Sequence, residues 1–179
     1  INGITVTRSS NANVQSFSIR GASEVAGGGI GNRVLLLLDG RPAITPESGG
    51  ALWNLVPLAA IERIEVIKGA YSSLYGSSAM GGIVNVITRT PDTASHSDLN
   101  LHYGAYGPAP AYTGYKRYND FFGAEFITSR KLNKWSYLFN FAGKSNDGNR
   151  EQSSFNLYNG YGKFKFDFSP NRSLQISAM

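Results

Sequence analysis

The sequence of 179 residues contains no cysteine, which excludes disulfides and thiolate metal sites in this chain. Charged residues contribute only 16%, whereas about 25% is usual in soluble domains. The longest aliphatic run, residues 34–38, has the length of a strand, and no segment approaches the roughly 18 apolar residues of a transmembrane helix. The formal net charge of +5 is spread along the chain without a run of like charges, so we expect no binding to nucleic acid.

Motifs of enzymes are also missing. The full P-loop motif does not occur: in the glycine-rich stretch 68–82, Lys68 precedes the glycines instead of following them. The glycine cluster at residues 27–31 lacks the spacing of a dinucleotide fingerprint, and no G-x-S-x-G is present. Glu62 and Glu65 would fall on opposite faces of a strand and are more simply explained as ion-pair partners of Arg63 or Lys68. We therefore predict no catalytic residue, no metal, no cofactor and no enzymatic activity.

The two halves of the chain differ in aromatic content. Only four of the 22 aromatic residues precede Asp98. A polar link containing Pro91 separates the halves, so we predict one domain at residues 1–92 and another at 93–179. No targeting sequence is recognisable, and the chain begins at Ile1 in strand-like sequence, which leads us to expect a fragment of a longer protein.

The first half is predicted to be a small α+β unit with a mixed sheet. Residues 34–38 have the continuous aliphatic pattern of a strand buried on both faces. The pair Asp39-Gly40 then indicates a turn. The further elements expected are a glycine-rich loop at 27–31, a helical turn at 57–60, a strand at 61–67, a short helix at 72–79 capped by Ser72 or Ser73, and a strand at 83–88.

The second half repeats one unit, a strand rich in aromatic residues. The expected strands are 99–106, 119–130, 135–144, 154–168 and 173–179. In residues 135–141 the aromatic side chains share one face and the polar side chains mostly share the other, which is the period-two pattern of transmembrane barrel strands. The connections alternate between long and short, as in outer-membrane barrels. This favours a membrane barrel over a soluble β domain, and because five strands cannot close such a barrel, further strands are expected.

Five sequence blocks in the first half resemble the plug domain of TonB-dependent outer-membrane receptors. They are FSIRG (17–21), VLLLLDGRP (34–42), IERIEVIKG (61–69), SLYG (73–76) and AMGGIVNVIT (79–88). Their order and spacing match over residues 1–90, and the later strands resemble the start of the family's 22-stranded barrel. One departure is Ala70, where the family usually has proline after the lysine-glycine or arginine-glycine pair.

The resemblance implies a function as well as a fold. Such a receptor lies in the outer membrane of a Gram-negative bacterium, in contact with outer-membrane lipid, and takes up a bulky nutrient. Its partner is TonB, which uses the proton-motive force to move the plug. A ferric siderophore is the expected cargo, with cobalamin, haem or a glycan as alternatives. A passive porin or adhesin with an N-terminal domain is the rival interpretation, which the plug motifs disfavour.

The resemblance also implies roles for individual residues. Residues of the plug motifs are expected to form turns, close packing and contacts within the plug or with the barrel: Arg20, Gly21, Asp39, Gly40, Glu62, Arg63, Glu65, Lys68, Gly69, Tyr75, Gly76, Gly81, Gly82 and Asn85. Cargo is expected at the loops 22–32, 41–50, 107–117 and 145–152, where Tyr106, Tyr112 and Tyr115 are the candidate ligand contacts.

Overall fold

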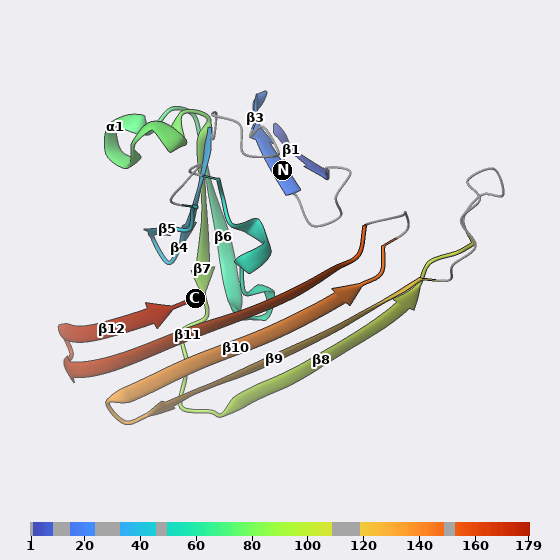
Figure 1. Cartoon of the computed structure of the whole chain (residues 1–179). Coiled ribbons are helices and arrows are strands. Elements are labelled where there is room, and N and C mark those ends of the chain that lie inside the picture. Colours follow the sequence, from blue (N-terminus) through green and yellow to red (C-terminus); the bar gives the residue numbers. More distant parts are fainter. Residues whose placement is uncertain (1, 9–14, 24–32, 46–49, 109–118, 149–152) are drawn as a thin grey trace. The chain divides into compact units, whose positions relative to one another are not determined.

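The computed structural model describes residues 2–8, 15–23, 33–45, 50–108, 119–148 and 153–179 (Figure 1). They form two compact units. The first unit comprises Ile1–Val56 and Ile61–Arg89, and the second comprises Pro57–Ala60 and Thr90–Met179. The short segment Pro57–Ala60 therefore belongs to the second unit, although its neighbours in sequence on both sides belong to the first.

The first unit contains a four-stranded mixed sheet with the strand order β5-β4-β7-β6. Its strands are β4 (Val34–Leu38), β5 (Arg41–Pro42), β6 (Ile61–Lys68) and β7 (Gly82–Thr88). Only β4 and β7 run parallel. Every side chain of β4 is buried, so the prediction of a strand covered on both faces is confirmed. The core gathers Leu35, Leu37, Ala79 and Ile83.

A second, antiparallel sheet of the first unit contains β1 (Ile4–Arg8), β2 (Gln15–Ile19) and β3 (Ala22–Ser23). This sheet was not predicted, because its strands are five residues long or shorter and no long apolar run marks them. Short helical segments complete the unit: η1 (Trp53–Leu55), α1 (Ser72–Tyr75) and η3 (Ser77–Ala79).

The predicted helix at 72–79 is split into α1 and η3 at Gly76, whose backbone has φ 85°. The capping prediction was wrong. Ser72 is itself the first helical residue, so the cap position falls on Tyr71, which makes no side-chain capping hydrogen bond.

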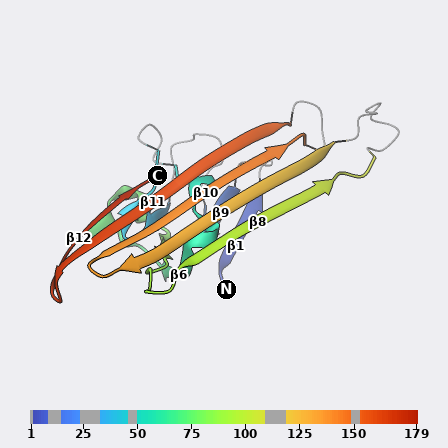
Figure 2. The same cartoon turned by 90° about the horizontal axis from the view of Figure 1, so that it is seen from below.

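The second unit contains five antiparallel strands that pair in sequence order, side by side in both views (Figures 1 and 2). They are β8 (His96–Ala105), β9 (Asp120–Leu132), β10 (Trp135–Asn146), β11 (Phe155–Ser169) and β12 (Arg172–Ala178). All five predicted strands are confirmed. Four of them have 10 to 15 residues, enough for the roughly 9–11 residues of a transmembrane strand. The helical turn η2 (Leu58–Ala60), also predicted, contacts β9 and β10.

The connections between these strands alternate in length, as the sequence predicts. Asn133-Lys134 and Pro170-Asn171 form two-residue turns, and Asn133 adopts the left-handed φ of 55° that tight hairpins require. The connections from β8 to β9 and from β10 to β11 are longer, and because the strands are antiparallel they join the opposite ends of the strands. A long connection therefore follows β8 and β10, and a short turn follows β9 and β11.

The two faces of this sheet differ in chemistry. The register places Leu99, Phe126 and Phe141 in one row on the same face, and Leu99 and Phe141 are 64% and 58% exposed. Ile127, Leu138 and Asn140 lie on the other face and are buried. An exposed apolar face of this extent is unusual for a soluble monomer and indicates contact with an apolar environment.

Candidate functional site

A tight turn at Asp39-Gly40 connects β4 to β5. It lies at the centre of a network of polar contacts that is formed by several of the plug-motif residues. Both residues have positive φ, 49° and 78°, as a type I′ turn requires. Asp39 N donates to Val86 O at 2.9 Å, and Gly40 N donates to Asn85 Oδ1 at 3.1 Å. The turn is thus attached to β7 by its own backbone amides.

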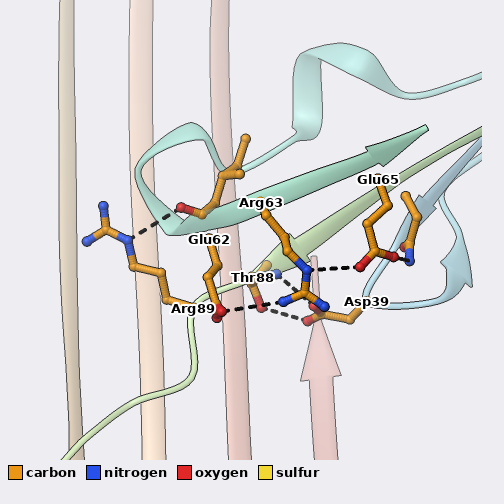
Figure 3. A network of polar contacts seen from close by, with 8 residues as sticks. Asp39, Glu62, Arg63, Glu65, Thr88 and Arg89 are labelled. Atoms are coloured by element: carbon orange, nitrogen blue, oxygen red, sulfur yellow. Dashed lines mark hydrogen bonds and ion pairs between the residues drawn. The ribbon is translucent and has the colours of Figure 1, made fainter.

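The Asp39 carboxylate closes over the end of β7. Its Oδ1 accepts a hydrogen bond from Thr88 N at 2.8 Å, and its Oδ2 accepts one from Thr88 Oγ1 at 2.7 Å (Figure 3). Thr88 is only 1% exposed, so an unpaired amide or hydroxyl there would be costly. Sequence reasoning missed Thr88 as a site residue, because a threonine that ends a strand carries no distinctive signal.

From Asn85 a chain of polar contacts runs along β6 (Figure 3). Asn85 Nδ2 donates to Glu65 Oε2 at 3.3 Å, and the Nε of Arg63 donates to Glu65 Oε1 at 2.9 Å. Glu62 Oε1 lies 3.4 Å from a terminal nitrogen of Arg63. The predicted ion pairing to Arg63 is confirmed. A register shift between Ile61 and Arg63 interrupts the strand alternation, and both carboxylates reach the same guanidinium.

These ion pairs are exposed. The side chain of Arg63 is 55% exposed, and those of its two partners are each 45% exposed. Exposed pairs of this kind contribute about 0–1 kcal/mol to stability. The cluster of one guanidinium and two carboxylates therefore contributes little to the stability of the sheet.

Other residues of the plug motifs shape the backbone of the first unit. Arg20 and Gly21 form the turn between β2 and β3 with φ 50° and 82°, and Arg20 N donates to Gly3 O at 2.8 Å. Lys68 Nζ donates to Asn2 O at 2.6 Å. These contacts hold the two sheets of the first unit to its N-terminal residues.

Close packing explains two of the predicted glycines. A Cβ on Gly82 would lie 2.5 Å from Ile67 O, and one on Gly81 would lie 2.5 Å from the Cβ of Ala22. Gly81 also accepts a hydrogen bond from the amide of Gly69 at 3.3 Å. No larger residue fits at either position without movement of its neighbours.

Tyr75 and Gly76 end α1. Tyr75 is 44% exposed, and Gly76 N donates to Ser72 O at 2.9 Å. The structure therefore assigns Gly76 to helix termination and leaves Tyr75 on the surface of the first unit.

Tyr106, the first candidate cargo contact, lies just after β8 and is held in place by its neighbours. Its hydroxyl is 3.2 Å from Oδ1 and 3.0 Å from Nδ2 of Asn146, and its ring packs on Phe121 with the centroids 5.5 Å apart. Tyr106 thus joins the bases of the two long connections. Tyr112 and Tyr115 lie outside the described residues, as do 24–32, 46–49, 109–118 and 149–152 of the predicted cargo loops.

Within the described part of the chain, no group of three or more His, Asp or Glu side chains could hold a metal ion. In the same residues no helix is both long and apolar enough to cross a membrane. The triplet Gly143-Lys144-Ser145 lies inside β10, whereas a phosphate loop needs the turn between a strand and a helix.

Comparison with known proteins identifies the first half of the chain. Residues 1–83 match the family of the TonB-dependent Receptor Plug Domain. Residues 1–83 therefore resemble the plug domain of TonB-dependent receptors, and in this chain five antiparallel strands follow them. The recognition and the fold class predicted from the sequence are confirmed.

Similar proteins include transporters and receptors. The chain is 43% identical to the Vitamin B12 transporter BtuB of Vibrio vulnificus over 74 residues, 41% of this chain and 12% of that protein. It is 43% identical to the Iron-regulated outer membrane virulence protein of Vibrio cholerae over 95 residues, 49% of this chain and 13% of that protein. The chain thus spans about an eighth of the length of these relatives.

Among solved structures, the pyoverdine outer membrane receptor FpvA from Pseudomonas aeruginosa has the same fold. The TM-score is 0.70 with 21% sequence identity, and the match covers 98% of this chain and 23% of that one. Both the plug sheet and the five strands are therefore included in the structural likeness.

Proposed function

We propose that the full-length protein is an outer-membrane receptor of a Gram-negative bacterium that takes up a bulky nutrient actively, with energy delivered by TonB. The observation that carries this proposal is the direct succession of two parts: a plug-domain sheet, and antiparallel strands with an exposed apolar face. A pore wide enough for a bulky nutrient needs an internal plug that can be moved. In this proposal residues 1–92 form the plug and residues 93–179 begin the barrel, with the apolar face against lipid.

The plug-motif residues take roles that agree with their contacts. Asp39, Gly40 and Asn85 keep the plug sheet intact, and the exposed cluster of Glu62, Arg63 and Glu65 contacts the wall of the complete barrel. Charge-assisted hydrogen bonds are specific but can exchange with water, which suits a contact that must be made and released.

The proposed cargo is a ferric siderophore. An iron-regulated relative and the fold of a pyoverdine receptor support it. Cobalamin is the second candidate, because a vitamin B12 transporter is 43% identical over its matched segment. Haem or a glycan would use the same mechanism.

Growth of the host with the gene deleted tests the cargo class. We expect the deletion strain to grow poorly when a ferric siderophore is the sole iron source and normally on freely diffusing iron. A defect confined to media in which cobalamin is required would assign the cargo to cobalamin instead. Normal growth under all these conditions would contradict uptake of either nutrient.

A further inference from the structure

The turn η2 is held by the strands of the second unit. Pro57 and Ala60 are fully buried, whereas Leu58 between them is 59% exposed. The chain enters this unit at Pro57 and leaves it after Ala60, where β6 begins at once with Ile61. No linker separates the buried turn from the strand that carries the charged cluster of Glu62, Arg63 and Glu65.

The carboxylate of Glu125 on β9 holds this turn. Its Oε1 accepts a hydrogen bond from Ala59 N at 3.0 Å and another from Asn140 Nδ2 at 3.1 Å. The donors come from η2 and from β10, so one oxygen joins three elements. Hydrogen bonds to an ionised carboxylate are about twice as strong as those between neutral groups.

Asn140 fixes the position of the carboxylate. Its side chain is 0% exposed, and within the described residues its Oδ1 has no hydrogen-bond partner. Leaving a buried amide oxygen unpaired costs stability, and a leucine would fill the position without this cost. The asparagine must therefore make a favourable contact that a leucine could not make. In this structure that contact is the hydrogen bond from Asn140 Nδ2 to the Glu125 carboxylate.

Glu125 is itself half-buried, on the face of the sheet that also carries the buried Asn140. The residues two positions away on the same face are Gly123 and Ile127, both buried. A carboxylate in such a position is expensive unless hydrogen bonds compensate it. The amide of Ala59 is one of the two donors that do so.

We propose that Glu125 is a positioning residue for transport: it holds the amide of Ala59 and thereby fixes the turn from which β6 starts, while Asn140 orients the carboxylate. This inference rests on the proposed function. Because Ala60 and Ile61 are adjacent in the chain, any displacement of β6 pulls directly on η2. The hydrogen bond from Ala59 to Glu125 is thus an early contact to break when the plug moves.

Hydrogen exchange of the full-length receptor, purified without TonB or cargo, tests this role. The variants are Glu125→Ala and Glu125→Gln, with Lys144→Ala as a control on the same face of the sheet. We expect amides of residues 59–61 to exchange about tenfold faster in Glu125→Ala. Glu125→Gln should restore most of the protection, because its amide oxygen still accepts from Ala59, and Lys144→Ala should resemble the wild type.

Two results would overturn the proposal. One is equal exchange of residues 59–61 in the wild type and Glu125→Ala. The other is faster exchange spread over β9 and β10, which would mean that Glu125 stabilises the sheet and not the turn. Neither readout needs cargo or energy, so a failure of the proposed transport function would leave this test unaffected.

Discussion

Asp39 and Thr88 are joined by two hydrogen bonds, although they lie 49 positions apart in the sequence. One carboxylate satisfies both the amide and the hydroxyl of a buried threonine, at 2.8 Å and 2.7 Å. The contact fastens the turn after β4 to the end of β7, the last strand before the chain passes into the second unit. The Asp39-Gly40 motif therefore forms a turn and also links the ends of the two central strands, β4 and β7, by hydrogen bonds.

Replacement of Asp39 by alanine is expected to destabilise the plug locally by about 1–3 kcal/mol, because it leaves a buried amide and hydroxyl unpaired. Hydrogen exchange of a peptide covering β7 in the full-length receptor measures this. Asp39→Asn should cost less, since its side-chain oxygen still accepts from Thr88 N and asparagine tolerates a left-handed φ. Equal protection of β7 in the wild type and in Asp39→Ala would contradict a stabilising role of the hydrogen bonds between Asp39 and Thr88.

Gly82→Ala is expected to destabilise the plug sheet by about 1–3 kcal/mol, because the added methyl group meets the carbonyl of Ile67 in a crowded core. The matched control is Gly107→Ala, where no atom lies within 4 Å of the added group. Limited proteolysis reports the fraction of open plug when opening is rapid. Cleavage within the plug should increase for Gly82→Ala only, and equal rates for both variants would refute the packing argument.

If the exposed apolar face lies against lipid, as proposed, Phe141→Arg should destabilise the folded protein by about 2–4 kcal/mol, the cost of a cation near the centre of a lipid-facing band. Phe141 is 58% exposed and lies in a row with Leu99 and Phe126. Guanidinium unfolding of the full-length protein in lipid vesicles provides the measurement, with Phe141→Leu as the apolar control. An arginine no more costly than the leucine would show that this face does not contact lipid.

Arg63→Ala is expected to change the unfolding free energy of the plug by less than about 1 kcal/mol, because its ion pairs are exposed. If the cluster contacts the barrel wall during transport, uptake of radiolabelled ferric siderophore should nevertheless fall. Hydrogen exchange and uptake measured on the same variant separate the two effects. Unchanged uptake would leave Arg63 without a role in transport.

Much of the fold could be predicted because the decisive patterns are local. The run at residues 34–38 identifies a buried strand, Asp39-Gly40 identifies a turn, and the alternation around Phe139 and Phe141 identifies a strand with one apolar face. The connections between the strands could be predicted from the turn residues and from the spacing of the strands alone. These features depend on neighbours within a few positions, which a single sequence displays directly.

The contacts that organise the site were not predictable, because they join distant residues through unremarkable groups. The hydrogen bond from Ala59 to Glu125 uses a backbone amide across 66 positions, and no side-chain pattern marks an amide. Glu65 shares a face with Arg63 in a regular strand, but Glu62 reaches the same guanidinium against this alternation, next to the register shift between Ile61 and Arg63. The roles of the plug-motif residues in transport stay predictions.

The proposed active transport is tested most directly by uptake of radiolabelled iron, supplied as a panel of ferric siderophores, into intact cells. Four strains are compared: with and without the gene, each with and without TonB. Iron from at least one siderophore is expected to enter only when both the receptor and TonB are present. Uptake that depends on the gene but persists without TonB would contradict active transport and indicate a passive pore.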